Sequence, residues 1–239
     1  MTGRVPGAGR SLVAGAERSL VAGAERSLVV IDGLDGSGKS QFTRALAAAC
    51  EAAGPAPFIF HVDDFRRPLG AVAADVDEAS VYYDRYYDFA LLDRCLRAFL
   101  DGASDATIPR FDSATEALAD TQTLTFDGAR LAFLEGVFVL RAPTAAAAAL
   151  IVLEVSEGEA RRRILARDMA RGRPRDVVEH RMSQRYFPAQ RAYRAAFDPL
   201  RRADVVIDNE RWDAPRVVRL APGRLPHLVE KVLSGVIPS

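Results

Sequence analysis

Lysine is nearly absent from this chain of 239 residues. Among its 32 basic residues only Lys39 and Lys231 are lysines, and the others are arginines. A coding bias towards GC-rich codons explains this imbalance without a functional cause. The scarcity still draws attention to Lys39, because it follows a short run of glycines in "GLDGSGKS".

Cysteine and histidine are also scarce, and the net charge is zero. Cys50 and Cys95 lie far apart and form no metal-binding spacing, which favours free thiols in a reducing compartment. The three histidines show no metal spacing either. The 32 basic and 32 acidic residues cancel, so no overall positive field points to a nucleic-acid partner.

Long apolar runs are missing as well. None approaches the roughly 20 residues that cross a bilayer, and the N-terminal stretch lacks the unbroken apolar core of a signal peptide. We therefore expect a cytoplasmic protein without a membrane partner. Residues 10–29 hold "RSLVAGAE" twice and then "RSLVV". We expect a mobile extension over 1–26, with an amphipathic docking segment as the alternative, and one folded domain over 27–239.

What is present is an alternation of strand-like and helix-like segments. Continuous apolar runs predict strands at 28–32, 58–65, 130–140, 150–155 and 203–208. Helical patterns cover 40–54, 86–102, 157–172, 177–201 (interrupted at Pro188) and 225–236. This alternation predicts an α/β fold in three layers, with a parallel sheet covered on both faces. Ligands of such sheets bind at the carboxyl ends of the strands.

The stretch "GLDGSGKS" over 33–40 matches the phosphate-binding pattern G-x-x-x-x-G-K-[ST], the P-loop. Glycines allow successive backbone N–H groups to point at phosphate oxygens, and the following helix adds its positive end. Lysine reaches the β- and γ-phosphates, and the serine hydroxyl can bind Mg²⁺. The predicted nucleotide-binding residues are Gly33, Asp35, Gly36, Ser37, Gly38, Lys39, Ser40 and Gln41.

Other segments narrow the class of P-loop protein. A switch GTPase typically carries a guanine-reading N-K-x-D sequence, which does not occur here. Motor ATPases usually contain an apolar strand that ends in two adjacent acidic residues. The segments "VLRAPT" from residue 139 and "LEVSEG" from residue 153 contain no such pair.

Five features, in order, resemble the uridine kinase and phosphoribulokinase-like family of P-loop kinases over residues 27–210. They are "DGLDGSGKS", "VDDF" (62–65), "IPRFD" (108–112), "FLEGVF" (133–138) and "RRILARDMARGR" (162–173), with "YFPAQRAY" and "ADVVIDN" after them. The resemblance implies ATP and Mg²⁺ as cofactors, a hydroxyl-bearing small molecule as acceptor, and a helical lid over about 157–176. A homo-oligomer is compatible with it.

The resemblance also implies roles for three acidic residues. Asp63 maps to the family acid beside the acceptor hydroxyl, as a catalytic and substrate-binding group and a candidate metal ligand, with a solvated loop acid as the alternative. Asp64 could share that role. Glu135, expected near the middle of an apolar strand, is assigned to Mg²⁺ together with Ser40; a structural ion pair with a buried arginine is the alternative.

The segment 161–175 is rich in arginine. A solvated helix face is preferred for Arg161 and Arg162. Since "ARDMARGR" matches the family's lid, Arg167, Arg171 and Arg173 are the predicted catalytic arginines, whose planar guanidinium groups suit a phosphoryl group in transfer.

The acceptor side departs from the family. Arg66 and Arg67 follow "DDF" where uridine kinases usually have tyrosine, and "SVYYDRYYDF" lacks the family's histidine. The predicted acceptor-binding residues are Asp63, Arg66, Tyr83, Asp84, Tyr87 and Phe111. The tyrosines could equally form a structural aromatic cluster, and Arg66 would suit an anionic acceptor.

Two classes of function follow. The leading hypothesis is an ATP-dependent kinase acting on a nucleoside such as uridine or cytidine, or on a related metabolite such as pantothenate or a sugar phosphate. The alternative is a nucleotide-binding regulatory ATPase without a small-molecule acceptor.

Overall fold

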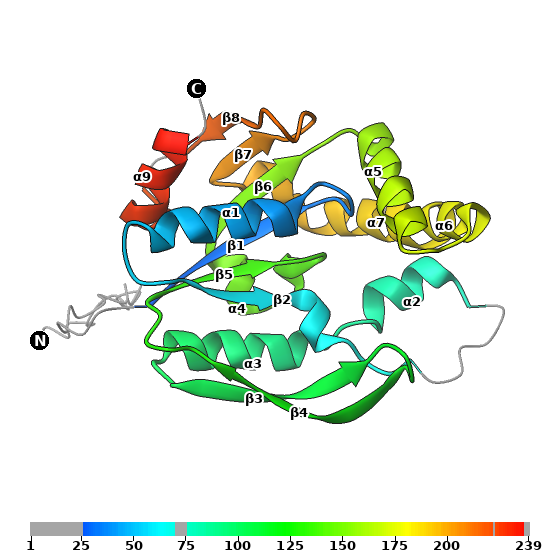
Figure 1. The fold of residues 1–239 in the computed structure, drawn as a ribbon, viewed down its shortest axis with the longest axis horizontal. Coiled ribbons are helices and arrows are strands. Elements are labelled where there is room, and N and C mark those ends of the chain that lie inside the picture. The colour runs from blue at the N-terminus through cyan, green and yellow to red at the C-terminus, as the bar shows by residue number, and fades with distance from the viewer. Residues whose placement is uncertain (1–25, 70–75, 222, 237–239) are drawn as a thin grey trace, which may run out of the picture.

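The computed structural model describes residues 26–69, 76–221 and 223–236 (Figure 1). The repeats over residues 10–25, and with them nearly all of the predicted extension, lie outside the described residues. Arg26 is described: its guanidinium donates hydrogen bonds to the carbonyl oxygens of Phe99 (2.9 Å) and Ala103 (2.6 Å). The first strand begins at the next residue, Ser27.

Six strands form the main sheet, in the order β2-β5-β1-β6-β7-β8. The first five in that order run parallel, and β8 is antiparallel to β7 at the edge. The predicted parallel sheet is confirmed, and β8 is an addition that the sequence pattern did not indicate. The strands are β1 (Ser27–Gly33), β2 (Phe58–His61), β5 (Leu131–Glu135), β6 (Ala149–Glu154), β7 (Val205–Asp208) and β8 (Arg216–Leu220).

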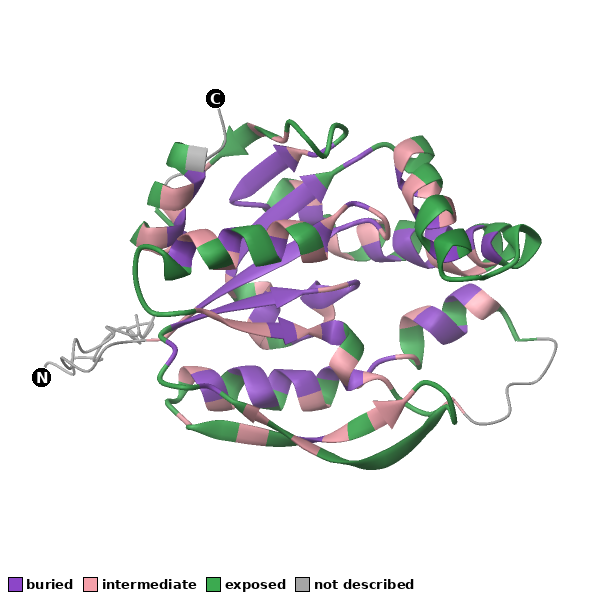
Figure 2. Ribbon diagram, viewed as in Figure 1, coloured by how far each residue is buried: buried purple, intermediate pink, exposed green. Residues whose placement is uncertain are grey.

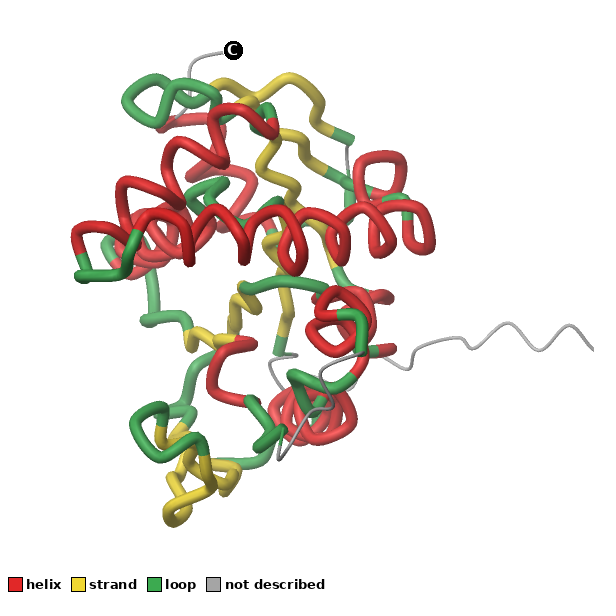
Figure 3. Tube along the Cα trace, turned by 90° about the vertical axis from the view of Figure 1, so that its right-hand side faces the viewer, coloured by secondary structure: helices red, strands yellow, loops and turns green. Residues whose placement is uncertain are grey.

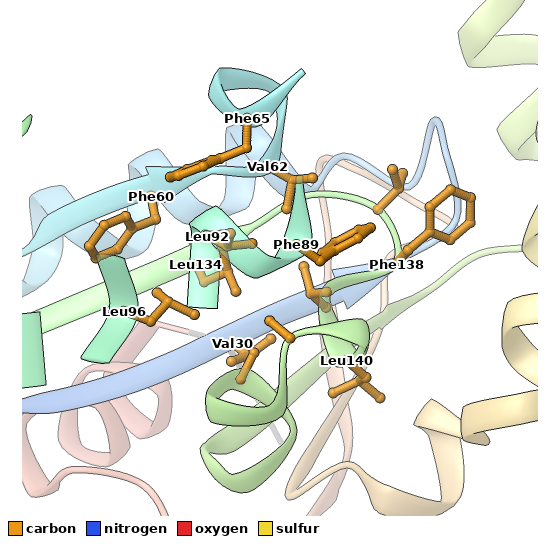
Figure 4. Packing of buried hydrophobic residues seen from close by; sticks show 14 of the residues in the cluster. Val30, Phe60, Val62, Phe65, Phe89, Leu92, Leu96, Leu134, Phe138 and Leu140 are labelled. Carbon is orange, nitrogen blue, oxygen red and sulfur yellow. The ribbon is translucent and has the colours of Figure 1, made fainter. Parts of the chain in front are cut away.

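Helices cover both faces of this sheet, so the predicted three-layer α/β fold is confirmed (Figure 2). Val29 and Ile31 of β1 pack towards α1 (Lys39–Glu51) and α9 (His227–Val236). Val30 faces the other side, with α3 (Phe89–Leu100), α4 (Pro143–Ala147) and α7 (Phe187–Phe197). Figure 4 shows this second face, where Phe60 and Leu134 of the sheet meet leucines of α3, all without exposed surface.

A hairpin and a short helix outside the main sheet were not predicted. β3 (Asp105–Asp112) and β4 (Ala117–Thr125) form an antiparallel hairpin set apart from the sheet (Figure 3). The short helix α2 (Glu78–Asp84) lies at the same end of the molecule as α5 (Glu157–Ala170) and α6 (Arg175–Arg181) (Figure 1). No helix in the described ranges is long and apolar enough to cross a membrane.

Three predicted boundaries are wrong. The strand predicted over 58–65 ends at His61, and Val62–Phe65 form the 3₁₀ turn η1. The strand predicted over 130–140 ends at Glu135, which is therefore terminal rather than central. Gly136 follows with φ 151°, and a Cβ there would lie 2.4 Å from Cβ of Val62, so the close approach of η1 ends the strand.

The third correction concerns the segment predicted as one helix interrupted at Pro188. It comprises α6 (Arg175–Arg181), the π-helical turn η3 (Met182–Tyr186), α7 and α8 (Pro199–Arg202). Pro188 lies in the first turn of α7, and the chain before it is already helical through η3. The wide turn precedes the proline, and such turns often mark functional segments.

Candidate active site

The backbone of the phosphate loop offers an unfilled set of donors. The loop joins β1 to α1, and the N–H groups of Gly36, Gly38, Lys39 and Ser40 find no acceptor among the described residues. These donors and the positive end of α1 form an anion site. Gln41, also predicted here, is different: its N–H donates to the carbonyl of Gly38 (3.1 Å), and its side chain is exposed.

Two of the loop glycines are required by close packing. Gly36 has φ 80°, and a Cβ there would lie 2.6 Å from the carbonyl oxygen of Ala160. Gly38 has φ 90°, and its Cβ would lie 2.9 Å from the side-chain nitrogen of Asn209. The loop is therefore held against α5 (Glu157–Ala170) and against the end of β7.

Lys39 is buried beneath the loop. Its ammonium donates to the carbonyl oxygens of Gly33 (2.9 Å) and Leu34 (2.8 Å). An ammonium has three donors, so one remains for a phosphate oxygen. The loop thus positions the lysine predicted for phosphate contact.

Ser40 and Glu135 meet at the carboxyl end of the sheet. The Ser40 hydroxyl lies 3.0 and 3.1 Å from the two carboxylate oxygens of Glu135. Strand pairing places Glu135 beside Ile31 of β1 on one side and His61 of β2 on the other. A hydroxyl and a carboxylate are the hard oxygen donors that Mg²⁺ prefers. The pair predicted from sequence is brought together.

Glu135 is a buried carboxylate with two partners. Burial raises the pKa of its carboxyl, but hydrogen bonds from His61 and Ser40 and the charge of Lys39 outweigh burial and hold it below its usual range. His61 Nδ1 lies 2.7 Å from Glu135, and this hydrogen bond raises the pKa of the imidazole. The partner of Glu135 is therefore a histidine, and the arginine ion pair considered as an alternative is absent from the described residues.

Asp63 is held by a tyrosine from a distant segment. It lies in η1, is exposed, and accepts a hydrogen bond from the Tyr87 hydroxyl at 2.9 Å. A backbone hydrogen bond joins the same two segments, from the N–H of Asp88 to the carbonyl oxygen of Phe65. Asp64 is partly buried, which raises the pKa of its carboxyl. Asp63 forms no hydrogen bond with Ser40 or Glu135, so the predicted metal ligands Ser40 and Glu135 are hydrogen-bonded to each other but not to Asp63.

Arg66 contacts two aromatic rings, and one of them, Phe111, was predicted to bind the acceptor. Its guanidinium carbon is 4.7 Å from the ring centre of Tyr86 and 4.3 Å from that of Phe111. One guanidinium nitrogen donates to the Tyr86 hydroxyl (2.6 Å), while Nε is buried without an acceptor in the described part of the chain. Arg66 and Phe111, predicted together from separate segments, are therefore in contact.

Tyr83 and Asp84 lie elsewhere on α2. The guanidinium of Arg141 stacks on the Tyr83 ring at 4.5 Å and donates to the Tyr83 carbonyl. Asp84 is 3.6 Å from the same guanidinium and is largely exposed. These two predicted acceptor residues are joined by Arg141 to the turn after β5, apart from the Asp63–Tyr87 pair.

The predicted lid arginines lie at the end of α5. Asp168 is fully buried, and it binds Arg167 and Arg173, each at 2.7 Å. Arg171 is exposed and makes no side-chain hydrogen bond in the described ranges. Burial lowers the pKa of the Arg167 guanidinium, but its bond to Asp168 and the charge of Asp35 outweigh that and raise it. Arg167 thus lies within electrostatic reach of the phosphate loop.

Three residues of the site, Asn209, Arg163 and Gln190, were given no role from the sequence, whereas Tyr82 belongs to the tyrosine segment "SVYYDRYYDF" considered there. Asn209 donates to the carbonyl of Ser37 at 2.7 Å, and Arg163 donates to the carbonyl of Asn209 at 2.8 Å. Tyr82 and Gln190 each lie 3.4 Å from a carboxylate oxygen of Asp35. Asn209 ends the segment "ADVVIDN", but no local sequence pattern indicates that it contacts a loop 172 positions earlier in the chain.

No family model matches the chain, and no curated protein matches it. A possible uridine kinase from Bacillus stearothermophilus has a similar fold, with a TM-score of 0.61 and 22% identity over 78% of this chain and 91% of that chain. A possible fructose transport system kinase from Silicibacter sp. TM1040 gives 0.60 and 25%, over 73% and 87%. The YGR205w protein gives 0.52 and 15%, over 78% and 85%.

These neighbours identify the fold. The chain has the three-layer fold of P-loop kinases that resemble uridine kinase, which confirms the predicted fold class and the resemblance stated from the motifs. The unpaired N–H groups of the loop fit a nucleotide polyphosphate, and the Ser40–Glu135 pair fits a magnesium ion.

Proposed function

We propose that the protein is an ATP-dependent kinase that transfers the γ-phosphate to a hydroxyl of a nucleoside or a related small metabolite. One observation carries the proposal. The Ser40–Glu135 pair of the donor side and the Asp63–Tyr87 pair of the acceptor side lie at the carboxyl ends of β1, β5 and β2, which are neighbouring strands. Ligands of parallel sheets bind at this edge.

Each residue has a role that its environment supports. The loop N–H groups and Lys39 bind the phosphates, and Ser40 and Glu135 would hold Mg²⁺, which supplies charge neutralisation when bound. Asp63 accepts the proton of the acceptor hydroxyl while the new oxygen–phosphorus bond forms and the bond to the ADP oxygen breaks. Arg167 and Arg173, and Arg171 beside them, stabilise charge on the transferred group.

The test is acceptor-dependent phosphorylation. Purified protein with Mg·ATP is given nucleosides, pantothenate and sugar phosphates, and products are identified by mass spectrometry. We expect one class to be phosphorylated, and Asp63→Asn to lower kcat by roughly 100-fold with the Kd of ATP unchanged. The matched control is Asp101→Asn, an exposed carboxylate at the end of α3. Equal rates for Asp63→Asn and wild type would refute the role of Asp63, and ATP turnover independent of every acceptor would favour the regulatory ATPase.

Arg66 favours a second candidate acceptor, which carries an anionic group. In the described ranges Arg66 has no carboxylate partner, its Nε lacks an acceptor, and two rings hold its guanidinium in place. A carboxylate or phosphate is the natural partner of such a group. If the acceptor is anionic, as pantothenate and sugar phosphates are, Arg66→Gln raises its KM about tenfold or more. Arg67→Gln, the exposed neighbour, is the control, and equal effects of the two changes would exclude this candidate.

A further inference from the structure

The phosphate loop carries a carboxylate where it should bind anions. Asp35 lies between Leu34 and Gly36 and forms no ion pair within 4.0 Å among the described residues. Its Oδ2 lies 3.4 Å from both the Tyr82 hydroxyl and the amide nitrogen of Gln190, which is near the outer limit for a hydrogen bond. No described side chain or N–H group donates to its Oδ1. The carboxylate therefore has free acceptor capacity.

The surroundings of Asp35 join the donor side to the acceptor side. Burial raises the pKa of the Asp35 carboxyl, and the negative charge of Asp63 raises it further. The positive charges of Lys39 and Arg167 partly offset this rise in the pKa. A carboxylate next to phosphate oxygens would repel them, so the side chain needs another partner. The backbone around Asp35 is part of the phosphate loop, but its carboxylate does not bind phosphate.

The partners of Asp35 come from α2 and α7, and the one from α2 adjoins the Asp63–Tyr87 pair. Tyr82 belongs to α2, and its ring centre is 6.1 Å from that of Tyr87, whose hydroxyl donates to Asp63. Gln190 comes from α7 and is 2% exposed, so its amide is directed into the interior. Two adjacent tyrosines thus hold two carboxylates, one from the phosphate loop and one from the end of β2.

We propose that Asp35 binds a second hydroxyl of the acceptor, beside the hydroxyl that Asp63 orients for phosphorylation. The acceptor is then polyhydroxylated, as a ribose or another sugar is, and Asp35 is a specificity-determining residue. This inference rests on the proposed kinase function. A carboxylate accepts a hydroxyl hydrogen bond strongly, and a site built for a hydroxyl discriminates against an analogue that lacks it.

The test combines substrate and protein changes. The best acceptor of the panel and each of its monodeoxy analogues are assayed with wild type and with Asp35→Asn. For wild type we expect one analogue to lose about 10- to 100-fold in kcat/KM. Asp35→Asn should lose a similar factor with the parent acceptor and then treat parent and analogue alike, while its KM for ATP stays within about twofold.

Three results separate the outcomes. A deoxy penalty in Asp35→Asn equal to that of wild type would overturn the role of Asp35 and leave the kinase function standing. If Asp35→Asn raises only the KM for ATP, the role of Asp35 is likewise overturned and the kinase function stands, because the carboxylate would then contact the nucleotide. Phosphorylation of no acceptor would overturn the proposed function and this inference with it.

A stability measurement and a second variant guard against a folding defect. Asp35→Asn removes a buried charge and should unfold at the same temperature as wild type or above it. Tyr82→Phe keeps the carboxylate but removes one of its two donors, and we expect a loss of discrimination of about two- to fivefold. Full discrimination in both variants would contradict the proposal. Asp101→Asn, an exposed carboxylate on α3, should discriminate as wild type does.

Discussion

At the scale of single residues, the shape of the phosphate loop depends on glycines that leave no room for a side chain, and Gly36 can be compared with Gly128, which lies outside the loop. A Cβ on Gly36 would lie 2.6 Å from a backbone oxygen of α5, whereas one on Gly128 would meet nothing within 4 Å. Both residues have positive φ, 80° and 72°. Substitution by alanine therefore strains the backbone at both sites, but only at Gly36 does the added Cβ collide with another atom.

We predict that Gly36→Ala abolishes detectable ATP binding, while Gly128→Ala lowers the free energy of unfolding by only about 1–2 kcal/mol. Isothermal titration calorimetry with ATP and Mg²⁺, together with thermal unfolding, measures both effects. If Gly36→Ala binds ATP as wild type does, the loop contact with Ala160 does not shape the site.

A second residue-scale prediction concerns Asp168, which anchors Arg167 and Arg173. Burial raises the pKa of its carboxyl, but the two guanidinium groups outweigh burial and hold it below its usual range. Its ion pairs therefore stabilise the fold above the unfolded pKa of about 3.9, and that contribution is lost as pH falls through the lower folded value. Since both arginines are over 40% exposed, the contribution is modest.

We expect Asp168→Asn to lower the free energy of unfolding by about 1–2 kcal/mol at pH 7. The difference from wild type should shrink as pH falls below about 3.9. Urea titrations at pH 7 and at successively lower pH check this. A difference that does not change with pH would show that the carboxylate charge has no part in holding the lid arginines.

At the scale of elements, two ion pairs and one aromatic contact join α6 and η3 to α2. The Glu78 carboxylate at the start of α2 accepts from His180 of α6 and from Arg185 of η3, both at 2.9 Å. Tyr82 of α2 also packs on Tyr186 of η3, with ring centres 5.4 Å apart. The position of α2, and with it of Tyr82, therefore depends on α6 and η3.

We predict that Glu78→Gln raises the KM of the acceptor a few-fold and leaves that of ATP unchanged, because α2 carries an acceptor-side residue. Amide hydrogen exchange in α2 should become faster. The change in unfolding free energy stays below about 1 kcal/mol, since the pair is partly exposed. The matched control is Glu179→Gln, whose ion pair with Arg175 lies within α6. Identical effects of the two variants would contradict a link between the elements.

The parts of the fold that local sequence patterns determine could be predicted from the sequence. The loop "GLDGSGKS" and the strands around it were predicted because continuous apolar runs and glycine spacing are local signals. Glu135 and Ser40 were paired through the family resemblance alone. The hairpin β3–β4 was not predicted because most of its residues are exposed and show no apolar alternation. The contacts of Asn209, Gln190 and Tyr82 arise from chain folding over long separations, which no spacing rule encodes.

At the scale of the whole molecule, the sheet collects the candidate groups at one edge. β1 leads into the phosphate loop, β5 ends in Glu135, and β2 ends before Asp63, and these strands are neighbours in the order β2-β5-β1. Parallel strands bring their carboxyl ends together, so the groups that the proposal assigns to donor and acceptor come from distant segments to one edge of the sheet.

The central claim is that the γ-phosphate of ATP passes to an acceptor hydroxyl at this edge. Phosphorus NMR of the protein with Mg·ATP and each acceptor of the panel tests it most directly, with Lys39→Ala as the inactive control. We predict that loss of the γ-phosphate signal is matched by a new phosphate monoester of one acceptor, and that Lys39→Ala shows neither change. Release of inorganic phosphate at a rate that no acceptor alters, with no new ester, would contradict the claim.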